Sequence, residues 1–154
     1  MPESIRVLLS TDEIAARVRE LGEEISRHYA QSSSLVLLMV LKGSFIFGAD
    51  LARAISLRNC RVEFLGVRSY GEGTESSGVV QITQDLSKPI AGEDVLIVED
   101  IVDTGLTIAH LLDLLKTRHP RSLRLCALLH KPARTRVRVS IDHLGFTIDD
   151  HFVV

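Results

Sequence analysis

Apolar residues along the chain follow two patterns, one typical of helices and one typical of buried strands. From Ile14 to Ile25 they recur at steps of four, three and four, which places them on one face of a helix. The segment STDE at 10–13 has the form of a capping box, so we expect the helix to begin there. By contrast, the run LVLLMVL at 35–41 is continuously apolar, as in a central parallel strand buried on both faces.

The rest of the chain alternates between the same two patterns. The segment SYGEGTESSG at 69–78 has almost nothing to bury and is predicted to be a mobile loop. Strands that alternate with helices indicate an α/β fold with a mainly parallel twisted sheet flanked by helices. We find no internal repeat and no linker, so we expect a single domain over residues 1–154. The further elements predicted are helices over 45–55 and 107–115, an exposed hairpin strand over 79–83, and strands over 62–67, 95–98, 123–129 and 144–148.

The composition narrows the classes of function. With 154 residues, 45% of them hydrophobic, the chain is long enough for one core. A net charge of -2 and 5% aromatic residues give no case for general attraction to nucleic acid or membranes. Cys60, Cys126 and six scattered histidines lack the spacing of a zinc site. The N-terminus does not resemble a signal peptide and the longest apolar run is too short for a bilayer, so we expect a cytoplasmic protein.

Candidate chemistry is concentrated in VLIVEDIVDTGLT at 95–107. Glu99, Asp100 and Asp103 place three carboxylates within five positions, although like charges so close repel one another. We place them just after the carboxyl end of a strand, where open α/β sheets bind ligands. Glu99 and Asp100 suit a sugar diol or a hydrated Mg²⁺, and the small, hydroxyl-bearing residues from Thr104 to Thr107 suit an anion at the start of a helix. Together they predict a site for a phosphorylated sugar.

Three other interpretations of this segment remain open on the residues alone. A Rossmann dinucleotide site would need GxGxxG here, and a P-loop would need GKS or GKT; both are missing. The run VLIVED is also similar to the phospho-acceptor strand of receiver domains, where it normally opens the domain. A purely structural strand-to-helix turn usually carries one acid as a helix cap, not three.

The thirteen residues VLIVEDIVDTGLT resemble the phosphoribosyl-pyrophosphate signature of type I phosphoribosyltransferases. Four further segments narrow the resemblance to hypoxanthine-guanine phosphoribosyltransferases, in the order in which that family carries them. They are LKGS at 41–44, SYG with the downstream ESSG, LLHKPAR at 128–134 and GFTIDDHFVV at 145–154. The resemblance covers essentially the whole chain and implies the type I fold, with a small hood and a flexible loop.

The resemblance also implies which residues carry the reaction. Asp103 would act beside N7 of the purine as general base and acid, while Glu99 and Asp100 would bind the ribose hydroxyls and Mg²⁺. Lys131 would donate to O6 of the base and so select 6-oxopurines over adenine. The other implied residues are Thr104, Gly105, Leu106 and Thr107 for the 5-phosphate, Lys42 and Gly43 for pyrophosphate, Ser69 and Tyr70 for the loop that closes over the reaction, and Phe152 and Val153 for the purine.

Several of these residues also have plain interpretations. Without the other motifs, Lys42 and Gly43 would indicate a surface turn, although the family's peptide before this lysine can be cis. Lys131 would be a solvated lysine at a strand end, and FVV at 152–154 a core strand. The alternating arginines at 134, 136 and 138 indicate a charged edge or a subunit contact, with Arg134 also a candidate for a phosphate contact.

The predicted function is purine salvage: transfer of the phosphoribosyl group from phosphoribosyl pyrophosphate to hypoxanthine or guanine, with Mg²⁺ as cofactor, by a homodimer or homotetramer. In the family, FVV continues into a segment with an Asp for a second Mg²⁺ and an Arg near pyrophosphate, and here the sequence stops at Val154. We therefore expect weakened catalysis. The alternatives are a non-catalytic regulator of the same fold that senses the sugar donor and binds RNA, or a receiver-like signalling domain.

Overall fold

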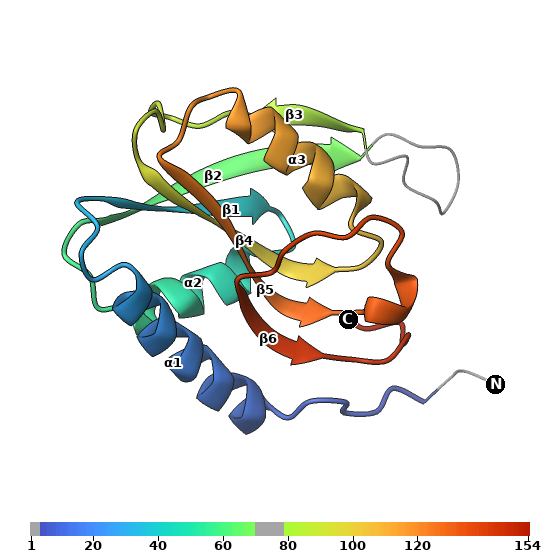
Figure 1. The fold of residues 1–154 in the computed structure, drawn as a ribbon. Coiled ribbons are helices and arrows are strands. Elements are labelled where there is room, and N and C mark those ends of the chain that lie inside the picture. Colours follow the sequence, from blue (N-terminus) through green and yellow to red (C-terminus); the bar gives the residue numbers. More distant parts are fainter. Residues whose placement is uncertain (1–3, 70–78) are drawn as a thin grey trace.

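The structure is a computed structural model, and it describes residues 4–69 and 79–154. Its six-stranded sheet has the order β3-β2-β1-β4-β5-β6, parallel except for β3, which pairs antiparallel with β2 (Figure 1). The predicted α/β class and mainly parallel sheet are therefore confirmed. The elements are α1 Thr11–His28, β1 Leu35–Leu41, α2 Phe45–Ala54, β2 Cys60–Ser69, β3 Val80–Gln84, β4 Asp94–Val102, α3 Leu106–Lys116, β5 Ser122–His130, a 3-10 turn η1 Pro132–Arg134 and β6 His143–Thr147.

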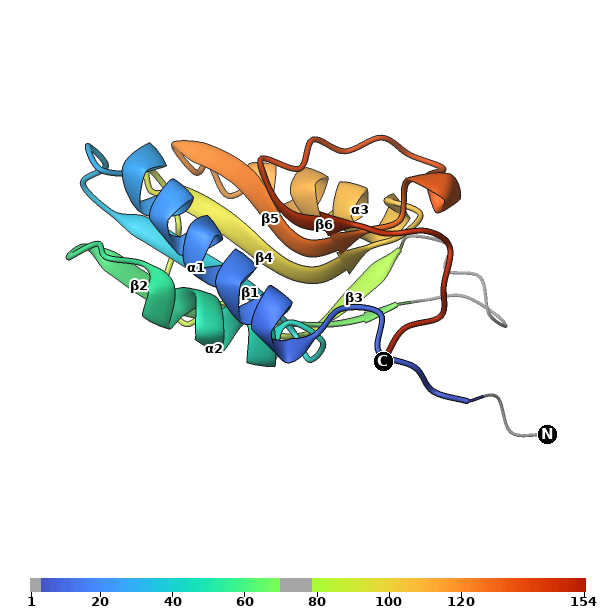
Figure 2. The same ribbon diagram turned by 90° about the horizontal axis from the view of Figure 1, so that it is seen from below.

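Helices cover both faces of the sheet, with α1 and α2 on one face and α3 on the other (Figure 2). Alternate residues of β1 enter the two cores: Leu37 packs with the α1 and α2 side, and Leu38 with the α3 side. This is why the run at 35–41 is apolar at every position. The continuous pattern was a correct sign of a strand buried on both faces.

The first helix begins as predicted. The Ser10 side chain accepts a hydrogen bond from the Glu13 N–H at 3.1 Å, and Glu13 accepts one from the Ser10 N–H at 3.3 Å, which is a complete capping box. Farther along, α1 passes close to α2 at Gly22, where a β-carbon would come within 2.4 Å of the Ala54 carbonyl oxygen. A glycine is therefore needed at this helix crossing.

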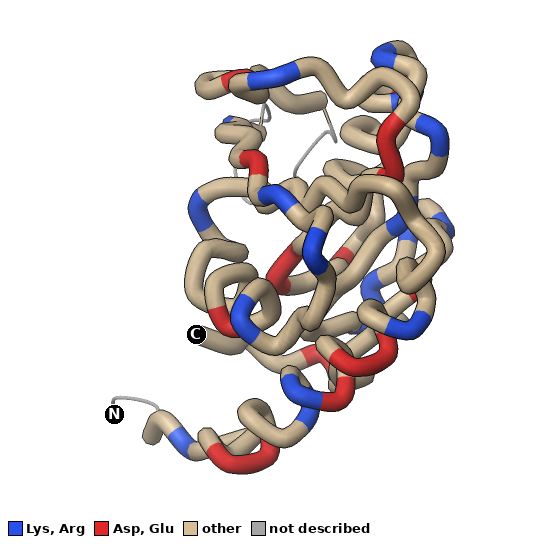
Figure 3. Tube along the Cα trace, turned by 90° about the vertical axis from the view of Figure 1, so that its left-hand side faces the viewer, with Lys and Arg blue, Asp and Glu red and all other residues tan. Residues whose placement is uncertain are grey.

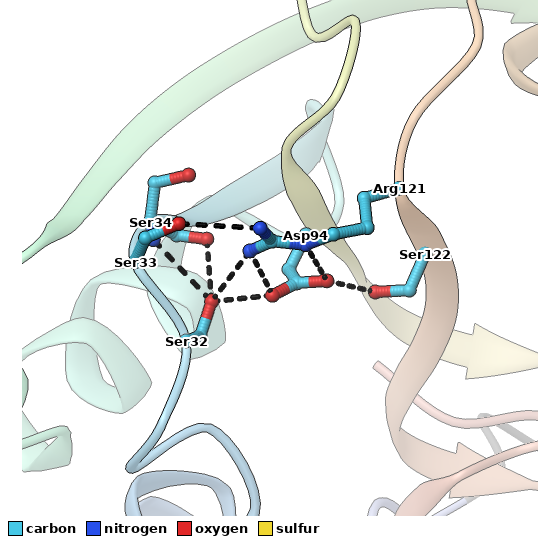
Figure 4. A network of polar contacts seen from close by, with 6 residues as sticks. All are labelled: Ser32, Ser33, Ser34, Asp94, Arg121 and Ser122. Atoms are coloured by element: carbon cyan, nitrogen blue, oxygen red, sulfur yellow. Dashed lines mark hydrogen bonds and ion pairs between the residues drawn. The ribbon is translucent and has the colours of Figure 1, made fainter.

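A buried carboxylate ties the amino ends of three strands together (Figure 4). Asp94, at the start of β4, accepts hydrogen bonds from Arg121 at 2.7 and 3.2 Å and from the Ser122 hydroxyl at 2.6 Å. Ser32, in the turn before β1, also donates to Asp94. These donors hold the pKa of Asp94 well below its usual range, with Arg121 the largest cause. This network lies at the strand starts, the opposite end of the sheet from the carboxyl ends.

Several strands are longer than predicted. The strand predicted over 95–98 extends to Val102, so Glu99 and Asp100 lie inside β4 and not after it. The parallel ladder with β5 extends this far because Val102 pairs with His130. Backbone pairing, and not side-chain polarity, sets the end of the strand. For the same reason β2 is longer than the predicted 62–67.

Candidate active site

The order of the strands places the candidate residues at one edge. The chain winds from β1 outward through β2 to β3, and then from β4 outward through β5 to β6. The direction of winding therefore reverses between β1 and β4, and ligands of open α/β sheets bind outside the carboxyl ends of the strands at this point. Lys42 and Gly43 follow β1 directly, and the acidic segment ends β4.

Gly43 lies against the Asp100 carboxylate. A β-carbon at position 43 would come within 2.6 Å of Asp100 Oδ2, so only a glycine allows this approach without movement of the acid. The other oxygen, Oδ1, accepts a hydrogen bond from the Ile101 N–H at 2.8 Å. The peptide between Leu41 and Lys42 is cis, as the resemblance suggested. The two segments predicted to handle pyrophosphate and ribose are thus in direct contact.

Glu99 is the titratable group that the site perturbs most. Burial and, to a smaller extent, the neighbouring Asp100 carboxylate raise the pKa of Glu99 to about 8. A carboxyl group in this setting is protonated near neutral pH, and a bound cation would favour its ionised form. Buried carboxyl groups with raised pKa values are common at functional sites.

The turn after Asp103 leads directly into α3. Gly105 adopts φ of +86° and precedes the first residue of α3, and a β-carbon there would come within 2.2 Å of the Val137 carbonyl oxygen. The Thr104 carbonyl oxygen accepts hydrogen bonds from the N–H groups of Arg136 and Val137 at 2.9 and 3.0 Å. The segment after β5 therefore supports this turn from behind. Sequence reasoning missed this support, because no pattern in 132–139 indicates which turn it packs against.

Asp103 has a partner that we did not predict. The Arg134 Nε lies 2.8 Å from Asp103 Oδ1, and the Arg134 Nη1 lies 3.8 Å from an oxygen of Asp150. The Asp103 contact is an ion pair and not a well-aligned hydrogen bond. In this structure, Arg134 therefore contacts a carboxylate of the acidic segment, whereas we had considered it for a phosphate contact.

Lys131 follows β5 and lies beside the acidic turn. Its N–H donates to the Val102 carbonyl oxygen at 3.0 Å, and the residue is only 7% exposed. It forms no ion pair or hydrogen bond through its ammonium group with any residue in 4–69 or 79–154. A largely buried cation of this kind is unlike the solvated strand-end lysine of the plain interpretation, and it suits an acceptor atom on a ligand.

The segment after β6 completes the edge on the other side. The Ile148 N–H donates to the His130 carbonyl oxygen at 2.9 Å, which holds residues 149–154 next to the end of β5. Residues 152–154 do not form a strand, and Phe152 is 94% exposed. Its ring therefore lies apart from the core, so the core-strand interpretation of FVV is wrong. Ser69 ends β2 and is exposed, whereas Tyr70 lies outside the described residues.

The described part of the chain lacks two further features. No helix within it is both long and apolar enough to cross a membrane. Residues 4–69 and 79–154 also contain no group of three or more His, Cys, Asp or Glu side chains arranged to hold a metal ion by themselves. On the side of the molecule that Figure 3 shows, basic positions are interspersed with acidic ones and do not gather into one basic face.

Comparison with known proteins gives consistent matches. Residues 6–154 match the model of the phosphoribosyl transferase domain family. The chain is 52% identical to a hypoxanthine-guanine phosphoribosyltransferase of Mycobacterium avium, over 96% of this chain and 75% of that protein. It is 47% identical to that of Dictyostelium discoideum, over 98% and 85% of the two chains. A solved structure of hypoxanthine phosphoribosyltransferase from Trypanosoma cruzi is 41% identical, with a TM-score of 0.92 and coverage of 100% and 83%.

Proposed function

We propose that this chain, which belongs to the hypoxanthine-guanine phosphoribosyltransferases, carries out their reaction at the carboxyl edge of β1, β4, β5 and β6. The reaction is the purine salvage step that joins a phosphoribosyl group to hypoxanthine or guanine. The observation that carries this assignment is the order of the strands in the sheet. The candidate pyrophosphate segment follows β1, the ribose-phosphate segment ends β4, and the purine segments follow β5 and β6, so neighbouring strands present neighbouring parts of the substrates.

The donor lies across β1 and β4 in this proposal. Lys42 and Gly43 bind pyrophosphate, and residues 104–107 hold the 5-phosphate at the start of α3, where the N–H groups of the first turn lack intrahelical partners. Glu99 and Asp100 bind the ribose hydroxyls. Ser69 and Tyr70 close over the reaction, because water would hydrolyse the donor. The contact between Gly43 and Asp100 fixes the pyrophosphate-binding segment relative to the ribose-binding carboxylates.

The same two carboxyl groups fit a magnesium ion. Mg²⁺ is usually held by one or two carboxylates together with water and substrate phosphates, and not by a cage of protein groups. Glu99 and Asp100 supply such a pair, and the raised pKa of Glu99 fits a place where a cation would offset the repulsion between the two acids. When bound, the ion would neutralise charge on pyrophosphate as it leaves. We therefore assign Glu99 and Asp100 as metal-binding as well as ribose-binding.

The purine lies over the ends of β4, β5 and β6. As the bond from N9 to the anomeric carbon forms and the bond to pyrophosphate breaks, the proton on N7 passes to the Asp103 carboxylate. Lys131 donates to O6, so adenine would leave a largely buried cation facing an amino group. Phe152 stacks on the base and the Val153 backbone meets its Watson–Crick edge. Phe152 is free to move onto a ligand because no core contact holds its ring.

The first experiment separates binding from chemistry. Calorimetric titration of phosphoribosyl pyrophosphate with Mg²⁺, followed by turnover with hypoxanthine, is performed on the wild type, Asp100→Asn and Asp103→Asn. We expect Asp100→Asn to weaken donor binding, and Asp103→Asn to keep it while turnover falls by roughly 10²–10⁴-fold. Asp113→Asn, an exposed acid on α3, is the matched control. A folded wild type that binds no donor would contradict the proposal.

Base selection gives a second, independent test. Because Lys131 is assigned to O6, Lys131→Met should reduce turnover with hypoxanthine and guanine while leaving donor affinity within a few-fold of the wild type. The alternative of an RNA-binding regulator predicts retention of RNA on filters at moderate salt, with no turnover. The basic positions interspersed with acidic ones in Figure 3 do not favour that alternative.

We further propose that the protein is a homodimer that associates through α2 and β2. Phe45 and Ile46 are 55% and 60% exposed at the start of α2. Val62 and Phe64 on β2 pair with Leu37 and Met39 of β1 and so face the side of the sheet that α2 covers, where both are also exposed. Light scattering after gel filtration should give a dimer for the wild type and a smaller mass for Ile46→Asp/Phe64→Asp.

One sequence-based expectation remains a proposal. A cytoplasmic location fits an enzyme that uses phosphoribosyl pyrophosphate, and cell fractionation tests it.

A further inference from the structure

The ion pair between Arg134 and Asp103 lies where the acidic segment meets the purine side of the site. Asp103 Oδ1 is cut off from solvent and has the Arg134 guanidinium as its neighbour at 2.8 Å. The Asp103 side chain as a whole remains 42% exposed, so the open side of the carboxyl group is the Oδ2 side. One oxygen is thus covered and the other is available to a ligand.

This arrangement has little value for folding. The Arg134 side chain is 46% exposed, and ion pairs between side chains exposed to this extent contribute little to stability. The backbone around Arg134 is nevertheless fixed. Its N–H donates to the Lys131 carbonyl oxygen at 3.1 Å, and the N–H groups of Arg136 and Val137 donate to the Thr104 carbonyl oxygen. The turn that carries Asp103 and the turn that carries Arg134 therefore hold each other in place.

We propose that Arg134 is a positioning residue that acts through Asp103, an inference that rests on the proposed role of Asp103 as general base and acid. The guanidinium holds Oδ1, which fixes the plane of the carboxyl group and directs Oδ2 toward N7 of the purine. A planar guanidinium suits this task because its N–H groups point in fixed directions, whereas a lysine ammonium is a rotating point charge.

Asp150 extends the same contact to the purine segment. The Arg134 Nη1 lies 3.8 Å from Asp150 Oδ1, and Asp150 is two residues before Phe152. A single side chain therefore lies between the acid that takes the proton and the segment that stacks on the base. The guanidinium that contacts Asp103 thus also lies near the carboxylate of Asp150.

The test compares Arg134→Ala and Arg134→Lys with Arg138→Ala, an exposed arginine of the same segment with no side-chain partner among the described residues. The kcat value and the KM values for hypoxanthine and phosphoribosyl pyrophosphate are measured for each. We expect Arg134→Ala to lower kcat about tenfold, a fraction of what the general base itself supplies, with the KM for the donor within about twofold. Arg134→Lys should restore only part of kcat. Free guanidinium ion should raise the kcat of Arg134→Ala but not that of the other variants.

Each outcome decides the question. A kcat for Arg134→Ala equal to that of Arg138→Ala would refute the positioning role. So would a loss of donor affinity in Arg134→Ala as large as its loss of kcat, with no rescue by guanidinium ion. In both cases a wild type that turns over keeps the proposed function intact. A wild type that binds donor but transfers nothing to hypoxanthine would overturn the proposed function, and the role of Arg134 with it.

Discussion

Replacement of Glu99 by glutamine tests the electrostatics of the site without any ligand. Burial, with help from the Asp100 carboxylate, raises the pKa of Glu99 from 4.5 to about 8. Between these two pH values the folded protein keeps a proton on Glu99 that the unfolded chain has released. Stability therefore falls as pH rises through this window and levels off above about pH 8. A glutamine side chain cannot ionise, so the Glu99→Gln variant should escape this loss.

The size of the effect follows from the difference between the two pKa values. Each pKa unit corresponds to ~1.4 kcal/mol, so ionised Glu99 costs the folded state at most about 5 kcal/mol. For a chain of this length, each kcal/mol corresponds to roughly 2–4 °C in Tm, so the upper limit is roughly 10–20 °C. Glu99→Gln should thus equal the wild type below pH 4.5 and exceed it above pH 8 by at most this amount.

The assay is thermal and urea unfolding of both proteins at about pH 4.5, 6.5 and 8.5, in buffer without Mg²⁺. Glu23→Gln is the control, because Glu23 is exposed on α1 and loses the same charge without the burial. A difference between Glu99→Gln and the wild type that is the same at all three pH values would refute the reasoning. So would a variant that is less stable than the wild type at the highest pH.

Three further substitutions probe the edges of the sheet. Gly43→Ala should weaken binding of the Mg²⁺ complex of phosphoribosyl pyrophosphate by about tenfold with little change in Tm, because its β-carbon would displace the Asp100 carboxylate; unchanged affinity by calorimetry would contradict this. Gly105→Ala should cost about 2 kcal/mol or more in urea unfolding, since it adds a strained positive φ to a clash with the Val137 carbonyl; wild-type stability would contradict it. Asp94→Asn should cost about 3 kcal/mol at pH 7, a penalty that shrinks as pH falls below about 4, because the unfolded wild-type chain then takes up a proton while folded Asp94, with its lowered pKa, stays ionised; a penalty independent of pH would count against the network.

The elements and the chemical character of the site could be predicted from residue order. A continuously apolar 35–41 and a capping box at 10–13 suffice for β1 and the start of α1, because burial on both faces and capping are local requirements. The acids, small residues and hydroxyl groups of 99–107 likewise indicate a sugar phosphate before any fold is known. These features depend on neighbours in the sequence, and the sequence displays them directly.

Tertiary structure decided the rest, because the deciding contacts join segments far apart in the chain. Gly43 touches Asp100 only because β1 and β4 pair as neighbours at the point where the winding reverses. The pKa of Glu99 is raised because β4, paired with β5, continues beyond this residue, and the Glu99 carboxyl group is buried there. Arg134 meets Asp103 because the segment after β5 folds back onto the turn after β4. No local pattern of polar and apolar residues predicts these contacts, because they depend on how the strands pair and how the loops fold back onto the strand ends.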